Sequence, residues 1–202
     1  MRRAMAVFFA GLLGVPASGT VTAGDTVAVD VYLDPDSALF NLIYGAKALT
    51  TEIFARIGVE LVWHNGPPRT SQAGLRSDRR PAIGISWDDA PAWAGTTVLA
   101  AAHPYGSPDT AITLYEDRLI EYLRAHKDEQ EVVLAYVLAH ELAHVMQGID
   151  RHSASGILKA QWTRDDCDLM RAGKLTFTPE DIELIRNGLL QRPSATTATM
   201  AG

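Results

Sequence analysis

Half of the six histidines in this 202-residue chain lie in residues 140–152, which read HELAHVMQGIDRH. His140 and His144 are four residues apart, so on a helix their side chains differ by about 40° in direction and by about 6 Å along the axis. Both imidazoles can therefore bind one metal ion, and Glu141 projects toward the same cleft. Neutral imidazole suits Zn²⁺, which in catalytic sites keeps one position for water. The pattern predicts a zinc centre.

A third ligand requires the helix to end soon after His144. If the helix continued, His152 would lie about 12 Å beyond His144 along the axis and could not reach the same ion. Gly148 is where the helix can end, because glycine accepts a positive φ and lets the chain turn back. A short return through 149–151 would then bring His152 to the metal.

This arrangement of HExxH, a glycine and a third histidine resembles the metzincin group of zinc endopeptidases. Their usual spacing is HExxHxxGxxH, whereas this chain reads HExxHxxxGxxxH, with one extra residue on each side of Gly148. Asp150 stands at the usual spacing of the third ligand and is the alternative to His152. We favour His152, because the glycine has itself shifted by one position and because His152-Ser153 is similar to the His-Ser pair of metzincins.

The residues after the third histidine extend the resemblance. Gly156 and Ile157 look like part of the turn that contains methionine in metzincins, and Leu158 stands near the methionine position. The resemblance implies that Gly156 forms the turn and that Leu158 supplies an apolar floor beneath the metal. The longer spacing, followed by Trp162, is similar to a group of short secreted bacterial metzincin-like proteins.

The resemblance implies hydrolysis of peptide bonds in a protein or peptide substrate, with Zn²⁺ as cofactor and Glu141 activating its water. It also implies a mixed sheet whose antiparallel edge strand, here 97–102, lines the cleft and pairs with substrate. Near the end of that strand, His103 and Tyr105 are expected to have ordinary loop roles. Two alternatives stay open: a non-catalytic secreted zinc-binding interaction module, and a peptidase whose third ligand is Glu180 or Glu183.

Hydrophobic periodicity predicts the elements that position these residues. Alternation over 26–33 indicates a half-buried strand, and apolar residues at helical spacing from Leu39 to Ile57 indicate a helix ended by Gly58. The segment 128–147 is apolar nearly all round, as in a helix buried in the middle of a domain. We predict one α/β (α+β) domain: a mixed five-stranded sheet, a buried active-site helix and a C-terminal helix. The remaining predicted strands are 59–63, 82–87, 97–102 and 111–115, and the remaining predicted helices are 116–125, 163–172 and one that starts at Thr178.

Composition limits the setting in which this domain works. Residues 1–23 read as a cleavable signal peptide, because the apolar run 4–15 is far shorter than the roughly 20 residues that span a bilayer. The domain would then cover 24–192, with a disordered tail at 193–202, in a secreted or periplasmic protein without stable membrane association after cleavage. The net charge of −6 does not suggest nucleic-acid binding. The only cysteine, Cys167, is expected to be a free structural thiol.

Overall fold

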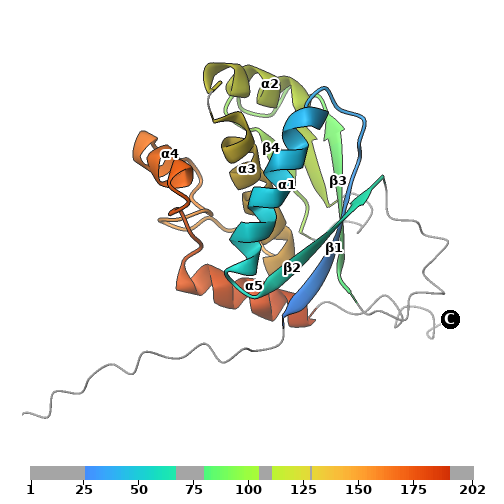
Figure 1. The fold of residues 1–202 in the computed structure, drawn as a ribbon, viewed down its shortest axis with the longest axis vertical. Coiled ribbons are helices and arrows are strands. Elements are labelled where there is room, and N and C mark those ends of the chain that lie inside the picture. Colours follow the sequence, from blue (N-terminus) through green and yellow to red (C-terminus); the bar gives the residue numbers. More distant parts are fainter. Residues whose placement is uncertain (1–25, 67–79, 105–110, 128, 192–202) are drawn as a thin grey trace, which may run out of the picture.

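The computed structural model describes residues 26–66, 80–104, 111–127 and 129–191 (Figure 1). The predicted signal peptide, the predicted tail and Tyr105 lie outside these residues. In the described part of the chain, no helix is long and apolar enough to cross a membrane. The elements follow the order β1 (Val27–Leu33), α1 (Phe40–Ala55), β2 (Val59–Asn65), β3 (Ala82–Asp88), β4 (Ala100–Ala102), β5 (Ile112–Tyr115), α2 (Glu116–Ala125), α3 (Gln130–Gln147), α4 (Arg164–Arg171) and α5 (Pro179–Gln191).

The strands form one five-stranded sheet in the order β2-β1-β3-β5-β4. Four strands are parallel, and β4 pairs antiparallel with β5 at the edge, so the predicted mixed sheet of a single α/β domain is confirmed. β4 is shorter than the predicted 97–102, because the chain before it forms a turn in which the Val98 N–H donates to the Gly95 carbonyl at 3.1 Å.

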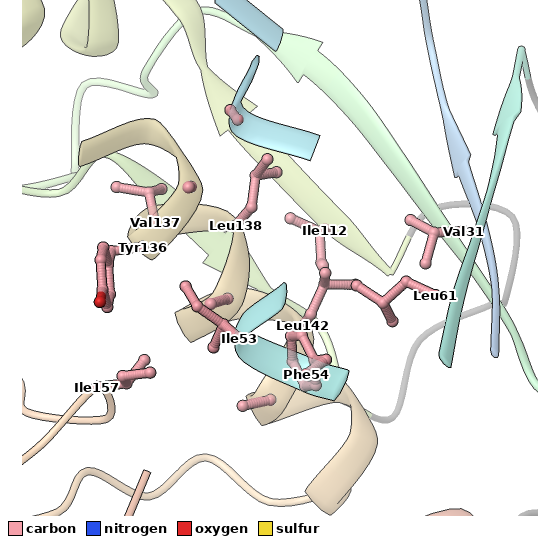
Figure 2. Packing of buried hydrophobic residues seen from close by; sticks show 14 of the residues in the cluster. Val31, Ile53, Phe54, Leu61, Ile112, Tyr136, Val137, Leu138, Leu142 and Ile157 are labelled. Carbon is pink, nitrogen blue, oxygen red and sulfur yellow. The ribbon is translucent and has the colours of Figure 1, made fainter. Parts of the chain in front are cut away.

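Helices α1 and α3 pack side by side on one face of the sheet (Figure 1). The apolar residues predicted for α1 are buried, and α3 is buried without a break from Val133 to Gln147, as its all-round apolar sequence predicts. Figure 2 shows Phe54 of α1 and Leu142 of α3 lying near Ile112 of β5 in this core. Helix α3 is therefore held by packed apolar side chains along most of its length.

The prediction that β1 is half-buried was wrong. Val29, Val31 and Leu33 face the helices as expected, but Asp30 and Tyr32 on the other face are also buried. His64 of β2 covers them, since its ring stacks on Tyr32 with centroids 4.6 Å apart and its Nε2 lies 2.9 Å from the Asp30 carboxylate. The contact between His64 and Asp30 thus buries the face of β1 that the alternation of hydrophobic residues predicts to be exposed to solvent.

Candidate metal centre

Helix α3 carries two histidines and a glutamate into its buried half. His140, Glu141 and His144 are each at most 9% exposed. The Nε2 atoms of His140 and His144 lie 3.0 Å apart, as the i, i+4 spacing on a helix allows. Burying polar groups is costly, so three of them side by side on an otherwise apolar helix favour a functional reason for their position.

Gly148 ends α3 and lets the third histidine return. Its φ is +69° and its N–H donates to the carbonyls of His144 and Val145 at 3.0 and 3.2 Å, which closes the last turn in a left-handed conformation. The chain then reverses, and the exposed His152 ring lies 5.3 Å from the His140 ring and 5.0 Å from the His144 ring, measured between centroids. The sequence-based prediction that the helix ends at Gly148 is confirmed.

The three histidines fit a zinc ion. One ligand atom from each of His140, His144 and His152 lies within 4.8 Å of the other two. Tetrahedral zinc with nitrogen ligands at about 2.0 to 2.1 Å places those nitrogens about 3.3 Å apart, close to the 3.0 Å between the Nε2 atoms of His140 and His144. Asp150 lines the same cavity but does not belong to this group of ligand atoms. Glu180 pairs instead with Arg151 at 2.6 Å, and Glu183 is exposed on α5.

A carbonyl from the following turn fixes the orientation of His140. Its Nδ1 lies 2.9 Å from the Ile157 carbonyl, which can only accept, so Nδ1 carries the proton and Nε2 presents a lone pair to the metal position. The Trp162 indole donates to the same carbonyl at 3.1 Å. Burial lowers the pKa of His140 to about 4, so the ring is neutral at neutral pH, the form that binds metal.

His144 is held in a similar neutral state. Its Nδ1 is buried without a hydrogen-bond partner of good geometry among the described residues. Burial and the neighbouring His152 lower its pKa, although the nearby Ile149 backbone opposes this shift. An imidazole that is neutral, buried and incompletely hydrogen-bonded has a nitrogen lone pair available for a cation.

The turn at Gly156 places the carbonyl that orients His140. Gly156 has a φ of +78°, and a Cβ at this position would lie 2.5 Å from the Thr176 backbone oxygen. The next residue, Ile157, donates its N–H to that same oxygen at 3.1 Å. Ile157 and the predicted floor residue, Leu158, are fully buried. The backbone role of Ile157 was not predicted, because a carbonyl contact leaves no signal in residue type.

A second unpredicted residue, Asp181 at the start of α5, fixes the segment around His152. Its carboxylate is completely buried and accepts hydrogen bonds from Ser153 Oγ and from Arg151 Nη1, the latter at 3.2 Å. It also accepts from the Thr178 N–H at 3.0 Å, while Thr178 caps the helix in return. Burial alone would raise the pKa of Asp181, but the hydrogen bonds from Ser153, Thr178 and Arg151 hold it below the usual value. Only the capping pattern at Thr178 to Asp181 was visible in the sequence.

Glu141 faces a cavity of about 590 Å³ between β4, α3 and the chain around Trp162. Burial raises the pKa of Glu141 to about 8, the Ala102 N–H opposes this shift by hydrogen bonding to the carboxylate, and the charge of Asp150 adds to it. The structure thus places Glu141 beside the histidine cluster with its carboxylate oriented by the edge strand. His103 is exposed and does not line the cavity, in keeping with the loop role expected for it.

The open edge of β4 forms one wall of this cavity. The Leu99 carbonyl accepts from the Tyr115 N–H at 3.0 Å, and the His103 N–H donates to the Ala111 carbonyl at 2.7 Å, so these residues face the sheet. Because peptide groups alternate along an antiparallel pair, Ala100 and Ala102 face away from β5. These residues line the cavity.

Comparison with known proteins shows a likeness in structure. No protein-family model matches the chain, and no curated protein matches its sequence. The crystal structure of archaemetzincin from Methanopyrus kandleri is similar over 85% of this chain and 99% of that chain, with a TM-score of 0.50 and 13% sequence identity. At this identity the likeness shows a shared fold, which agrees with the metzincin-like architecture predicted from residues 140–158.

Proposed function

We propose that the protein is a secreted or periplasmic zinc-dependent endopeptidase. The observation that carries this proposal is the convergence of His140, His144 and His152 beside a buried Glu141, in a cavity whose wall is the open edge of β4. A likeness in fold to archaemetzincin supports it. His140, His144 and His152 are the proposed ligands, because their donor atoms are the ones that lie close enough to share an ion.

The residues of the cleft have distinct proposed roles. The three histidines would hold a zinc ion, which would supply Lewis-acid chemistry by lowering the pKa of water and polarising the carbonyl of the scissile bond. Glu141 would accept a proton from water and deliver it to the leaving amine. The Ala102 N–H holds the Glu141 carboxylate in place, and the outward peptide group of Ala100 pairs with substrate as an added strand.

Replacement of the proposed base tests the activity. Glu141→Gln keeps the size of the side chain but removes proton transfer, so cleavage of an unfolded protein should fall by roughly 10² to 10⁴. Zinc content should stay unchanged, because Glu141 is not among the proposed ligands. Glu131→Gln is the matched control, since Glu131 is an exposed glutamate in the first turn of the same helix. A wild type that binds zinc yet cleaves no member of a broad peptide library would favour the non-catalytic binding module.

The choice of third ligand is tested by a pair of variants. His152→Ala should lose most bound zinc, whereas Asp150→Ala should retain it, because Asp150 lies outside the cluster of donor atoms. Metal content per chain after dialysis, measured by atomic emission, distinguishes them. Zinc retained in His152→Ala and lost in Asp150→Ala would reverse the assignment.

A further inference from the structure

A second cavity adjoins the proposed catalytic cleft. It has a volume of about 460 Å³ and lies between the end of α2, the start of α3 and the exposed face of α4. Tyr122 and Trp162 line both cavities, so these two aromatic side chains form the boundary between them. Figure 1 shows α4 on the side of α3 that faces away from the sheet.

The cavity presents a surplus of positive charge in a chain whose net charge is −6. Its charged lining residues are Lys127, Arg164, Arg171 and Glu129. Arg171 is already neutralised by ion pairs with Glu129 and Asp168. Lys127 and Arg164 are exposed and make no ion pair with any residue that the structure describes. Two cations are therefore available to an incoming anion.

The N-terminus of α4 is capped by its own side chains and is not part of the surface that could bind an anion. Thr163 and Asp166 form a capping box, in which the Thr163 N–H donates to the Asp166 carboxylate at 2.6 Å and the Asp166 N–H to the Thr163 hydroxyl at 3.4 Å. The Asp166 carboxylate also pairs with Lys159. Binding of an anion would rest on the side chains of Lys127 and Arg164.

The cavity lies only a few residues of extended peptide away from the proposed metal position. The Trp162 ring that bounds it lies 5.6 Å from the His140 ring, measured between centroids. An extended chain advances about 3.3 Å per residue, so a group that enters beyond Trp162 belongs to the second or third residue from the cleaved bond. That residue can be part of the chain or its end.

We propose that this cavity, bounded by Tyr122 and Trp162 and flanked by Lys127 and Arg164, is a subsite that binds a carboxylate of the peptide substrate, two or three residues to one side of the cleaved bond. The inference rests on the proposed peptidase function. The carboxylate comes either from an acidic side chain or from the C-terminus of the substrate, and Arg164 offers the planar donor geometry suited to both.

Peptides that differ in a single charge test the subsite. In a series of fluorogenic peptides, one of the three positions on either side of the cleaved bond is Glu, Gln or Lys. Each peptide is made twice, once as a C-terminal amide and once as a free acid. Glu at one position should raise kcat/KM over Gln by about fivefold, as expected for solvent-accessible ion pairs, and Lys should lower it. An effect confined to free acids identifies the terminal carboxylate as the source.

The double variant Lys127→Gln/Arg164→Gln should abolish the preference for the carboxylate, so that kcat/KM of the preferred peptide falls to that of the Gln peptide amide. Arg124→Gln is the control, because Arg124 is an exposed arginine on α2 that does not line the cavity. Both variants change exposed residues and should unfold at the wild-type temperature. A carboxylate preference that survives the double variant, or equal cleavage of the Glu, Gln, amide and free-acid peptides, overturns the proposal.

A binding measurement separates this proposal from the proposed activity. Zinc-loaded Glu141→Gln is titrated into labelled Glu and Gln peptides, and fluorescence anisotropy gives the ratio of their Kd values. Tighter binding of the Glu or free-acid peptide, lost on adding Lys127→Gln/Arg164→Gln, supports the subsite even if the wild type cleaves nothing. Equal Kd values overturn the subsite even if the wild type is an active peptidase.

Discussion

Gly156→Ala should destabilise the protein far more than the same change at Gly148. Both glycines have positive φ, +78° and +69°, so each substitution carries the cost of about 1 kcal/mol or more for placing a side chain in the left-handed region. A Cβ at Gly148 meets nothing within 4 Å, whereas one at Gly156 would lie 2.5 Å from the Thr176 backbone oxygen. Gly148→Ala is therefore a control for the conformational cost alone.

The clash at Gly156 cannot be relieved by rotating a side chain. The Thr176 oxygen belongs to the backbone and accepts the Ile157 N–H at 3.1 Å, so relief requires the two segments to move apart. Overpacking of this kind costs about 1 to 3 kcal/mol. The total for Gly156→Ala is then about 3 kcal/mol, against about 1 kcal/mol for Gly148→Ala. At about 2 to 4 °C per kcal/mol, Tm should fall by about 6 to 12 °C and about 2 to 4 °C respectively.

The assay is urea unfolding of metal-free protein, followed by circular dichroism, so that zinc does not contribute to the difference. Zinc affinity is then measured by competition with a chelator. Displacement of Ile157 should also loosen the carbonyl that orients His140, and such partners of metal-binding histidines affect affinity by about 10- to 100-fold. Equal destabilisation by the two substitutions would show that the contact between Gly156 and Thr176 does not constrain the turn.

Three further predictions concern other parts of the molecule. Asp181→Asn should reduce the free energy of unfolding by about 1.5 to 3 kcal/mol at pH 7, because the charged acceptor of Ser153 and Arg151 is lost. The pKa of Asp181 in the folded protein lies below the usual value, so its contribution is complete above the unfolded pKa of about 3.9 and is lost as pH falls through the folded pKa. A difference from wild type that stays constant in urea unfolding down to pH 2 would contradict this. Saturating zinc should raise the Tm of wild type measured by calorimetry, with a stabilisation of about 4 kcal/mol when free zinc is 1,000 times Kd, and should leave Tm nearly unchanged in His152→Ala; equal shifts would exclude His152 as a ligand. Mass spectrometry of the protein secreted by its native host should find an N-terminus near Gly24, and an intact N-terminus on membrane-bound material would indicate an anchor instead.

Much of the fold was predictable because its elements carry strong local signals. The apolar spacing from Leu39 to Ile57 predicts a helix with one buried side. The all-round apolar sequence of α3 predicts a helix that is buried on every side. The short Ala-rich β4 carried a weaker signal, and its length was overestimated: Thr97 belongs to a turn, and the strand begins only at Ala100. The buried outer face of β1 was missed because its cover, His64, belongs to another strand and acts through a polar contact with Asp30.

In the candidate site, too, the features with a local sequence signal were predicted and the contacts between distant residues were not. The pair on α3 and the end of the helix at Gly148 follow from spacing and from the backbone preference of glycine. The contacts that hold the rest of the site join residues far apart in sequence: Ser153 with Asp181, 28 residues later, and His140 with the carbonyl of Ile157, 17 residues later. Neither contact follows from residue type, because aspartate at the start of a helix is common for capping alone and a carbonyl is present at every position.

The segment from Gly148 to His152 is one residue longer than the usual metzincin spacing, and the contacts with Asp181 hold it in place. A longer return between the end of α3 and the third histidine has more conformational freedom to lose when His152 is positioned. Both neighbours of His152 are fixed to one buried group, since Arg151 and Ser153 each hydrogen-bond to Asp181, and Arg151 also pairs with Glu180 at 2.6 Å. His152 itself remains exposed between two anchored residues. The capping box of α5 therefore restricts the lengthened loop, and the position of the proposed third ligand depends on a helix that begins 27 residues after it.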